Sequence, residues 1–453
     1  MTRIAATAAP LCLALLAGCG NPLMPTPVGF DRQGADPFAR TAQQDRDTRV
    51  RLFLASNRTI HQGAAPAAYF GNDRALRLHL GTLDVRIGDD GLAWDRLVDL
   101  SRTDGREGSP PVTIRAIDDF GPAWTQAIGM VAMRTPGAID EAVRGRFTSE
   151  IDRELASCGS SDLFVFLHGF NTDVPGNAAV AASLFHYLGR NGAFVQFEWP
   201  SRNSVWSYQA DKAAASASVR TFRGFLQHVA CSTKAERIHV IAHSAGAPIA
   251  LEAIHELRLM QAAEPADAVR RSLRLGRLVL VAPDMDLGDF RDCVADGTTE
   301  VPERTTIYVS SRDKALDFSA WMTGFARLGQ PLQALTPRQV EFLEDDANVD
   351  IIDVAAAERR VGSWLGHSYF HEDPWVSTDV LLTLATGVHP LDRGLQRDGE
   401  RKVYAFGDQY PDRAREAARR ALATVAGAAP APPAAAARGA SASPPPAPEA
   451  PAP

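Results

Sequence analysis

The chain has 453 residues, of which 45% are hydrophobic and 22% are charged, and its formal net charge is −7. This is the composition of a globular protein that is long enough to bury a large core. The acidic balance and the lack of a long Lys/Arg run argue against a nucleic-acid-binding protein, and we expect no nucleic-acid partner.

The first residues have the pattern of an export signal. Arg3 forms a short positive region, and the apolar stretch over residues 8–17 is too short to act as a stop-transfer helix. The stretch ends in Leu16-Ala17-Gly18-Cys19, which resembles the lipobox of bacterial lipoproteins. That resemblance implies that residues 1–18 are removed and that Cys19 is lipidated, which would hold the protein on a membrane surface. An ordinary signal peptide that contains a cysteine is the alternative.

Gly20 bears on which membrane carries the anchor. It stands where some lipoproteins have the aspartate that retains them at the inner membrane. We therefore expect an exported protein, attached to the bacterial envelope at the outer membrane and facing the periplasm.

Three cysteines remain after export and lipidation. Cys158 and Cys231 lie six residues before Phe164 and Arg237, where two predicted strands begin, and these strands would be neighbours in the fold argued below. We therefore predict a Cys158–Cys231 disulfide and a free Cys293. Three reduced, partly buried thiols are the alternative. The cysteines have no zinc-ligand spacing, and we expect no metal and no other cofactor.

Along the rest of the chain, residues 19–48 lack periodicity and predict a flexible tether. Residues 50–55 and 76–87 alternate apolar and polar side chains, as half-buried strands do. Six continuous apolar runs follow, at residues 163–167, 194–197, 238–242, 278–282, 306–310 and 349–354. Helical patterns lie between the runs or beside them, at residues 139–156, 178–188, 213–230 and 248–259.

Apolar strands that alternate with helices indicate a parallel sheet covered on both faces. The pattern predicts an α/β-hydrolase fold with a mostly parallel eight-stranded sheet, in one domain over residues 49–425. The Ala/Pro-rich tail over residues 426–453 cannot bury a core, and we expect it to be disordered. Residues 318–348, between the last two predicted strands, are numerous enough to form a lid or a pocket wall.

The segment over residues 237–246, with the sequence RIHVIAHSAG, has the form of a nucleophile elbow. An apolar run leads into Ser244, small residues flank it, and a helical pattern follows at once. Ala242 replaces the first glycine of G-x-S-x-G, whereas Gly246 keeps the last. The segment predicts Ser244 as a nucleophile and the Ala245 N–H as an oxyanion donor. A turn of small residues without chemistry is the alternative.

An acid and a histidine follow in the order that the hydrolase fold requires. Asp313 comes after the seventh predicted strand and His367 after the eighth. His367 would accept the Ser244 proton, Asp313 would orient the imidazole, and the Phe170 N–H would be the second oxyanion donor. Asp284, after the sixth strand, is an alternative acid that could equally cap the next helix.

The combined motifs resemble those of a bacterial family known only as α/β hydrolases of unknown function. The resemblance runs from about residue 49 to residue 369 and rests on His168-Gly169-Phe170-Asn171, Trp199-Pro200-Ser201, Tyr208-x-x-Asp211, Ala242-His243-Ser244-Ala245-Gly246, Ala282-Pro283-Asp284, residues 308–316 and Gly366-His367-Ser368-Tyr369. It implies the hydrolase fold and the set of Ser244, Asp313 and His367. It names no substrate.

These observations predict an esterase- or lipase-like serine hydrolase that acts on carboxylic esters or related acyl compounds through an acyl-enzyme. The partners we expect are an acyl or ester substrate, either a small molecule or a lipid, and the membrane reached through the N-terminal anchor. A non-catalytic binding or scaffold protein of the envelope is one alternative. An acyltransferase is another, because it shares the acyl-enzyme and differs in the acceptor.

Overall fold

The computed structural model describes residues 21–125, 138–310, 346–358, 367–399 and 402–427, together with Asp313, Leu316, Ala320 and residues 327–329. The predicted signal peptide, Cys19, the tail beyond Gly427 and almost all of the predicted lid segment lie outside the described residues.

One twelve-stranded sheet runs through the described part of the chain, in the order β1-β4-β3-β2-β6-β5-β7-β8-β9-β10-β12-β11. Its strands are β1 (Asn21–Pro22), β2 (Arg49–Ile60), β3 (Phe70–Ile87), β4 (Pro111–Thr125), β5 (Asp162–Leu167), β6 (Ala193–Glu198), β7 (Arg237–His243), β8 (Leu275–Val281), β9 (Arg304–Val309), β10 (Val349–Asp353), β11 (Gln396–Arg397) and β12 (Val403–Ala405). In the sheet order, the neighbouring strands β2-β6-β5-β7-β8-β9-β10-β12 pair in parallel. The pairs β1–β4, β4–β3, β3–β2 and β12–β11 are antiparallel.

The eight predicted strands are present as β2, β3 and β5 to β10, and the predicted fold class is confirmed. Four further strands extend the sheet beyond the eight expected. The long strand β4 escaped the sequence pattern because its pairing with β3 shifts register three times, between Leu78 and His79, Leu80 and Gly81, and Asp84 and Val85. Each irregularity breaks the two-residue alternation that identifies a strand.

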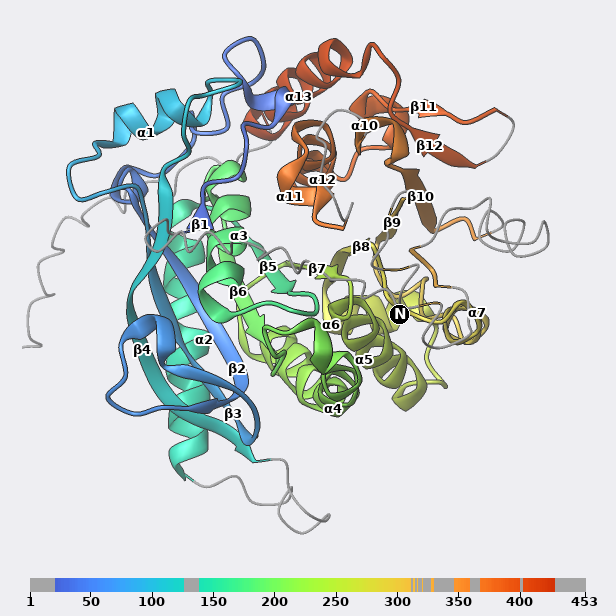
Figure 1. Ribbon diagram of the computed structural model, residues 1–453. Coiled ribbons are helices and arrows are strands. Elements are labelled where there is room, and N and C mark those ends of the chain that lie inside the picture. Colours follow the sequence, from blue (N-terminus) through green and yellow to red (C-terminus); the bar gives the residue numbers. More distant parts are fainter. Residues whose placement is uncertain are drawn as a thin grey trace, which may run out of the picture.

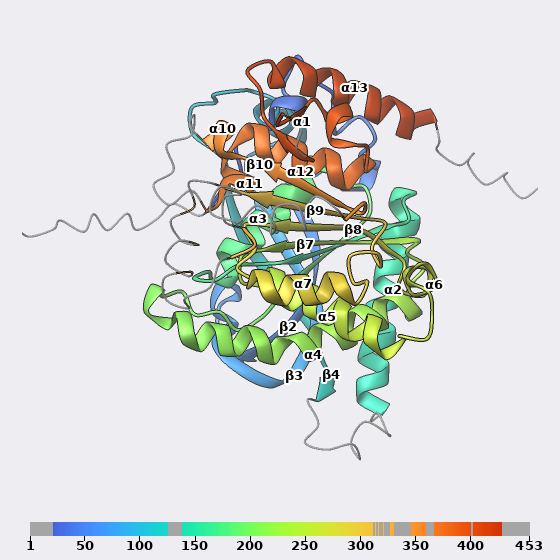
Figure 2. The same ribbon diagram turned by 90° about the vertical axis from the view of Figure 1, so that its right-hand side faces the viewer.

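Helices cover both faces of the sheet, as Figure 2 shows for α12 and α13 above it and α4, α5 and α7 below it. The helices are α1 (Trp94–Ser101), α2 (Ala138–Cys158), α3 (Val174–Tyr187), α4 (Tyr208–Ser232), α5 (Gly246–Met260), α6 (Ala266–Leu273), α7 (Leu287–Ala295), α10 (Ala355–Glu358), α11 (Tyr369–Glu372), α12 (Pro374–Thr386) and α13 (Tyr410–Gly427). No helix within the described residues combines the length and the apolar character needed to cross a membrane.

Each face of the sheet has its own hydrophobic core. On one face α2, α4 and α5 pack on the strands through side chains such as Phe147, Phe225 and Ile249. On the other face α3, α12 and α13 do so, through side chains such as Val380. The central strands are therefore buried on both sides, which explains their continuous apolar sequence.

The segment over residues 21–48 differs from the flexible tether that we expected. Leu23, Phe30 and Phe38 are buried in the core beside α3 and α13. The backbone of Leu23 donates to the Pro110 carbonyl over 2.8 Å, and Arg415 of α13 pairs with Asp31 over 2.6 Å. Scattered apolar residues without helix or strand periodicity anchor this segment, so periodicity alone could not reveal its packing.

The predicted Cys158–Cys231 disulfide is wrong, because both cysteines are free thiols in the structure. The strands that follow them, β5 and β7, are indeed neighbours. The side chains nevertheless point to different surroundings. The Cys158 sulfur lies 3.2 Å from the Gly192 amide nitrogen, whereas Cys231 is exposed near the end of α4. Cys293 is free and buried.

Candidate active site

Ser244 sits at a sharp turn between β7 and α5, in a conformation that few non-glycine residues adopt. Its φ angle is 52°, in the left-handed region. The turn is possible because two nearby residues are glycines, which have no Cβ atom. A Cβ atom on Gly246 would lie 2.5 Å from the His168 carbonyl oxygen, and one on Gly169 would lie 3.0 Å from the Ser244 Cβ. The small residues of the motif thus allow two loops to meet at the serine.

His367 lies between Ser244 and Asp313. Its Nε2 atom is 2.7 Å from Ser244 Oγ, and its Nδ1 atom is 2.6 Å from Asp313 Oδ2. The second Asp313 oxygen accepts the Leu316 backbone N–H over 3.0 Å. Because a carboxylate only accepts, His367 donates from Nδ1, which makes Nε2 the acceptor for the serine proton.

His243, the residue before the serine, contacts the backbone of His367. Its Nε2 atom lies 3.0 Å from the His367 carbonyl oxygen, and the two rings are 4.9 Å apart. Burial lowers the pKa of His243 well below its usual value, and the nearby His367 lowers it further. His243 is therefore neutral near pH 7, with the proton on Nε2 donated to that carbonyl.

Asp284, the alternative acid, has other partners. Its carboxylate accepts the Tyr208 hydroxyl over 3.0 Å and lies 3.4 Å from Nε of Arg327. Its backbone N–H donates to the Ser244 carbonyl over 3.2 Å, so Asp284 stabilises the turn at the serine. The next helix, α7, is capped by Asp286, whose side chain accepts the Gly288 N–H.

The two predicted oxyanion donors flank the serine from two loops. Ala245 is the N-cap of α5, and Phe170 lies in the loop after β5, next to Gly169. Neither backbone N–H donates a hydrogen bond within the described part of the chain. The Ala245 N–H stands at a helix start, where it has no partner inside the helix, and the Phe170 N–H is presented by a loop, so both groups can receive a negative oxygen.

A buried polar cluster fixes the loop that carries Phe170. The His168 ring stacks on Trp199 with the ring centres 5.0 Å apart, and the Trp199 indole donates to the His168 carbonyl over 2.8 Å. The Arg58 guanidinium pairs with Glu198 over 2.8 Å, and Glu198 also lies 3.3 Å from His168 Nε2. Burial alone would raise the pKa of Glu198, but His168 and Arg58 lower it to about 2.

Other motif residues hold the surrounding loops. Asp211 accepts the Ser201 hydroxyl over 2.9 Å and the Arg202 N–H over 3.0 Å, which closes the loop after β6. On the other side of the site, the Tyr369 hydroxyl donates to the Tyr308 carbonyl over 3.0 Å. That contact ties the segment of His367 to the strand that precedes Asp313.

A small cavity of about 210 Å³ adjoins the serine. Ala245 forms part of its wall, with α4 and α5 on one side and the segment after β8 on the other. Six of its thirteen lining residues are charged, namely Lys212, Glu252, Asp284, Asp286, Asp289 and Arg327.

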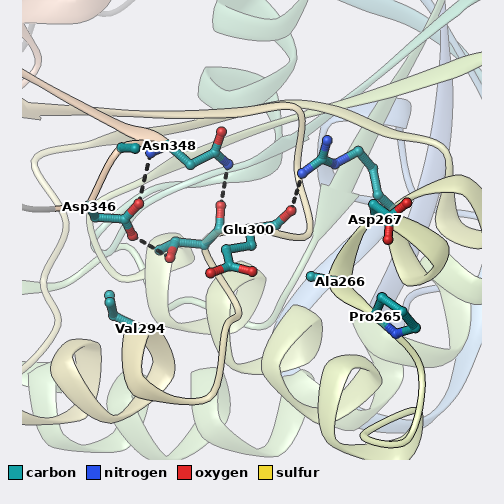
Figure 3. Close-up of a pocket in the computed structure, with 10 residues that line it drawn as sticks. Pro265, Ala266, Asp267, Val294, Glu300, Asp346 and Asn348 are labelled. Atoms are coloured by element: carbon teal, nitrogen blue, oxygen red, sulfur yellow. Dashed lines mark hydrogen bonds between the residues drawn. The ribbon is translucent and has the colours of Figure 1, made fainter.

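A larger cavity of about 710 Å³ lies at the opposite edge of the sheet, before the strands β8, β9 and β10 (Figure 3). Its polar groups bind one another. Thr299 donates its hydroxyl to Asp346 over 2.5 Å, and the backbone of Asn348 donates to the same carboxylate over 2.8 Å. We assign this cavity no role in the chemistry at Ser244. No group of three or more His, Cys, Asp or Glu side chains within the described residues could hold a metal ion.

Sequence reasoning did not assign roles to Arg58 or Glu198. Arg58 and Glu198 come from separate strands, and only the sheet order β2-β6-β5 brings them under the same loop. A charged residue in a strand is ordinarily read as solvent-facing, so its burial could not be foreseen.

One family model agrees with this architecture. The model of the family described as "Alpha/beta hydrolase of unknown function (DUF900)" matches residues 144–384, more than half of the chain. An uncharacterized protein of Nostoc sp. is 27% identical over 120 residues, a match that spans 23% of this chain and 31% of that protein.

Two solved structures also share similarity with the chain. A predicted CIB-like hydrolase from Thermoplasma acidophilum is 13% identical, with a TM-score of 0.28, over 49% of this chain and 84% of that one. An inhibited esterase B from Lactobacillus rhamnosis is 12% identical, with a TM-score of 0.30, over 50% of this chain and 78% of that one.

Proposed function

The chain belongs to this family of α/β hydrolases of unknown function, and from that premise we propose that it is a serine hydrolase acting on carboxylic esters or related acyl compounds. The observation that carries the proposal is His367, which lies within hydrogen-bond distance of Ser244 on one side and Asp313 on the other. A serine hydroxyl needs such a base, because it is a weak nucleophile at neutral pH.

The geometry supports a two-step acyl transfer. Ser244 Oγ attacks the acyl carbonyl as its proton passes to His367 Nε2, and Asp313 stabilises the resulting imidazolium. The N–H groups of Phe170 and Ala245 stabilise the oxyanion. His367 then returns the proton to the departing alkoxide, which leaves an acyl-enzyme. A water molecule, activated in the same way, releases the carboxylic acid and restores the serine.

The proposal includes the location of the enzyme. The lipobox resemblance at Leu16-Ala17-Gly18-Cys19 supports export and lipidation at Cys19, with the protein attached to the bacterial envelope. The outer membrane, facing the periplasm, is favoured because Gly20 follows the cysteine.

Labelling with a fluorophosphonate tests the proposed chemistry. The protein without residues 1–19 should react with the probe, whereas Ser244→Ala and His367→Ala should not. Circular dichroism and thermal unfolding of the same samples establish that the variants are folded. A folded wild-type protein that stays unlabelled would contradict the proposal and favour a binding protein of the envelope. If labelling occurs, product analysis with water or an added alcohol as acceptor separates hydrolysis from acyl transfer.

A further inference from the structure

The folded body begins almost immediately after the proposed lipid anchor. Asn21 and Pro22 form β1, which pairs with the start of β4. Only Gly20 separates Cys19 from Asn21, so the two Cα atoms of Cys19 and Asn21 are at most about 7 Å apart. A flexible tether would let an anchored enzyme take any orientation, but so short a link holds the surface around Asn21 against the membrane.

The surface around Asn21 borders the oxyanion loop. β1 contacts α3, as Figure 1 also shows, and the Asn21 side-chain amide approaches Gly176 in the first turn of that helix, 4.0 Å from where a Cβ would lie. The N-cap of α3 is Asp173, which accepts the Gly176 N–H over 2.8 Å. Asp173 comes only three residues after Phe170, so the chain entry lies close to the loop that carries the oxyanion donor.

Trp206 is 94% exposed and lies in the segment between β6 and α4. The residues before and after Trp206 both contact the loop that carries Phe170. Asn203 donates to Asp173 over 3.3 Å, and the Tyr208 ring packs edge-on against Phe170 with the centres 5.4 Å apart. Full exposure of an indole in water leaves a large apolar area unburied, whereas the membrane–water interface is the environment that tryptophan prefers.

We propose that the face formed by Asn21, Asp173, Asn203 and Trp206, which we name the anchor face, rests on the membrane that holds Cys19. The active site then opens at the lipid–water interface, and its substrate is an acyl ester of a lipid in that same membrane. This inference rests on the proposed function and adds to it the class of substrate and the way in which the enzyme meets it.

The test uses the full-length lipidated protein in vesicles of phosphatidylethanolamine and phosphatidylglycerol. The vesicles carry a self-quenched fluorogenic diacyl phospholipid, and a water-soluble p-nitrophenyl butyrate assay runs in parallel. A Gly/Ser spacer of about twenty residues, inserted after Gly20, releases the anchor face from the bilayer by about 25 Å. We expect the spacer to lower the ratio of vesicle to soluble-ester activity by about tenfold or more.

A pair of surface variants makes the test specific. Trp206→Ser should lower the same activity ratio severalfold. Met260→Ser is the matched control, because Met260 is 62% exposed at the far end of α5, away from the anchor face. It should leave the ratio unchanged.

The outcomes distinguish the inference from the function on which it rests. Hydrolysis of the soluble ester, with no turnover of the vesicle lipid or no effect of the spacer and of Trp206→Ser, would overturn the inference and leave the serine hydrolase intact. An N-terminus without acyl chains in mass spectrometry would overturn it too. Failure of both the soluble-ester assay and fluorophosphonate labelling would instead refute the proposed function.

Discussion

His243 Nε2 and the carbonyl oxygen of His367 are 3.0 Å apart, so the residue before the proposed nucleophile holds the backbone of the proposed base. The contact joins two segments that are 124 residues apart in the sequence. It places His243 in the role of a positioning residue, which touches no reacting atom but limits where the His367 ring can lie.

Replacement of His243 should therefore impair catalysis without removing it. His243→Phe keeps a ring but loses the donor, and we expect kcat to fall about tenfold with little change in KM, since one neutral hydrogen bond contributes about 0.5–1.5 kcal/mol. His243→Gln, whose amide can reach the same carbonyl, should recover most of the loss. Equal rates for both variants in steady-state ester hydrolysis would show that the hydrogen bond has no positioning role.

The two candidate acids can be separated by matched substitutions. Asp313→Asn should lower kcat by about 10,000-fold, because an amide at this position can donate to His367 Nδ1 and favours the wrong tautomer. Asp284→Asn should cost about tenfold or less, since its carboxylate binds Tyr208 and lies beside Arg327. Rates of fluorophosphonate labelling and of ester hydrolysis provide the comparison. The reverse ranking would identify Asp284 as the acid.

The tight approach at the elbow predicts an asymmetry between two glycines. A Cβ on Gly246 would lie 2.5 Å from the His168 carbonyl and 2.9 Å from the Leu167 carbonyl, both on the backbone. Gly246→Ala should thus destabilise the fold by about 1–3 kcal/mol and abolish labelling. Gly224→Ala, within α4 and with no atom within 4 Å of the new Cβ, should stabilise the protein by about 0.5–1 kcal/mol. Urea unfolding of both variants measures the contrast.

A buried ion pair between α12 and the segment before β11, next to Tyr308 of β9, should matter for stability. Asp379 accepts two hydrogen bonds from Arg393, at 2.7 and 3.0 Å, and one from the Tyr308 hydroxyl at 2.7 Å. Asp379→Ala leaves the buried guanidinium without its carboxylate, and the free energy of unfolding should fall by about 3–5 kcal/mol. Asp267→Ala, which breaks an exposed pair with Arg271, should change it far less, because water and salt screen exposed pairs. Similar losses in the two variants would contradict this ranking.

His186 should make stability depend on pH. Arg190 donates to its Nδ1 atom over 3.1 Å, and its Nε2 atom faces the Ser101 oxygen at 2.8 Å, so the ring is held neutral. Burial, with Arg190 and Arg106 nearby, lowers the pKa of His186 well below its usual value. Below about pH 6.5 the unfolded chain therefore binds a proton that the folded protein does not.

The contribution of His186 to the free energy of unfolding is thus fully present above about pH 6.5. It is lost as the pH falls, by up to about 1.4 kcal/mol per pH unit. Urea unfolding at a series of pH values should show a flatter dependence for His186→Phe than for the wild-type protein. Parallel curves for the two proteins would show that His186 takes no part.

The sequence was sufficient to predict the central strands, because β5 to β10 are buried on both faces and their residues form continuous apolar runs. It also pointed to Ser244, Asp313 and His367, since each follows a strand whose carboxyl end could be located, and the structure brings all three side chains together. Their catalytic roles, like those of Phe170 and Ala245, stay predictions until they are measured.

Long-range packing is what the sequence could not supply. The burial of Phe30 depends on α13, nearly four hundred residues later in the chain. The disulfide prediction failed for a related reason. Neighbouring strands say nothing about the direction in which Cys158 and Cys231 point, because each cysteine lies on a helix that precedes its strand.

The two ends of the twelve-stranded sheet share a feature with a consequence for association. The terminal strands, β1 and β11, are each two residues long and exposed, and Pro22 in β1 has no N–H to donate. A long unpaired edge rich in apolar residues would recruit strands from other molecules and lead to aggregation. At the β11 end only a short row of backbone groups is open. At the other end β1 covers only Pro111 and Val112 of the longer strand β4. The rest of β4 carries Asp118, Asp119 and Pro122 and pairs with β3 in a shifting register, features that discourage this edge from joining another copy.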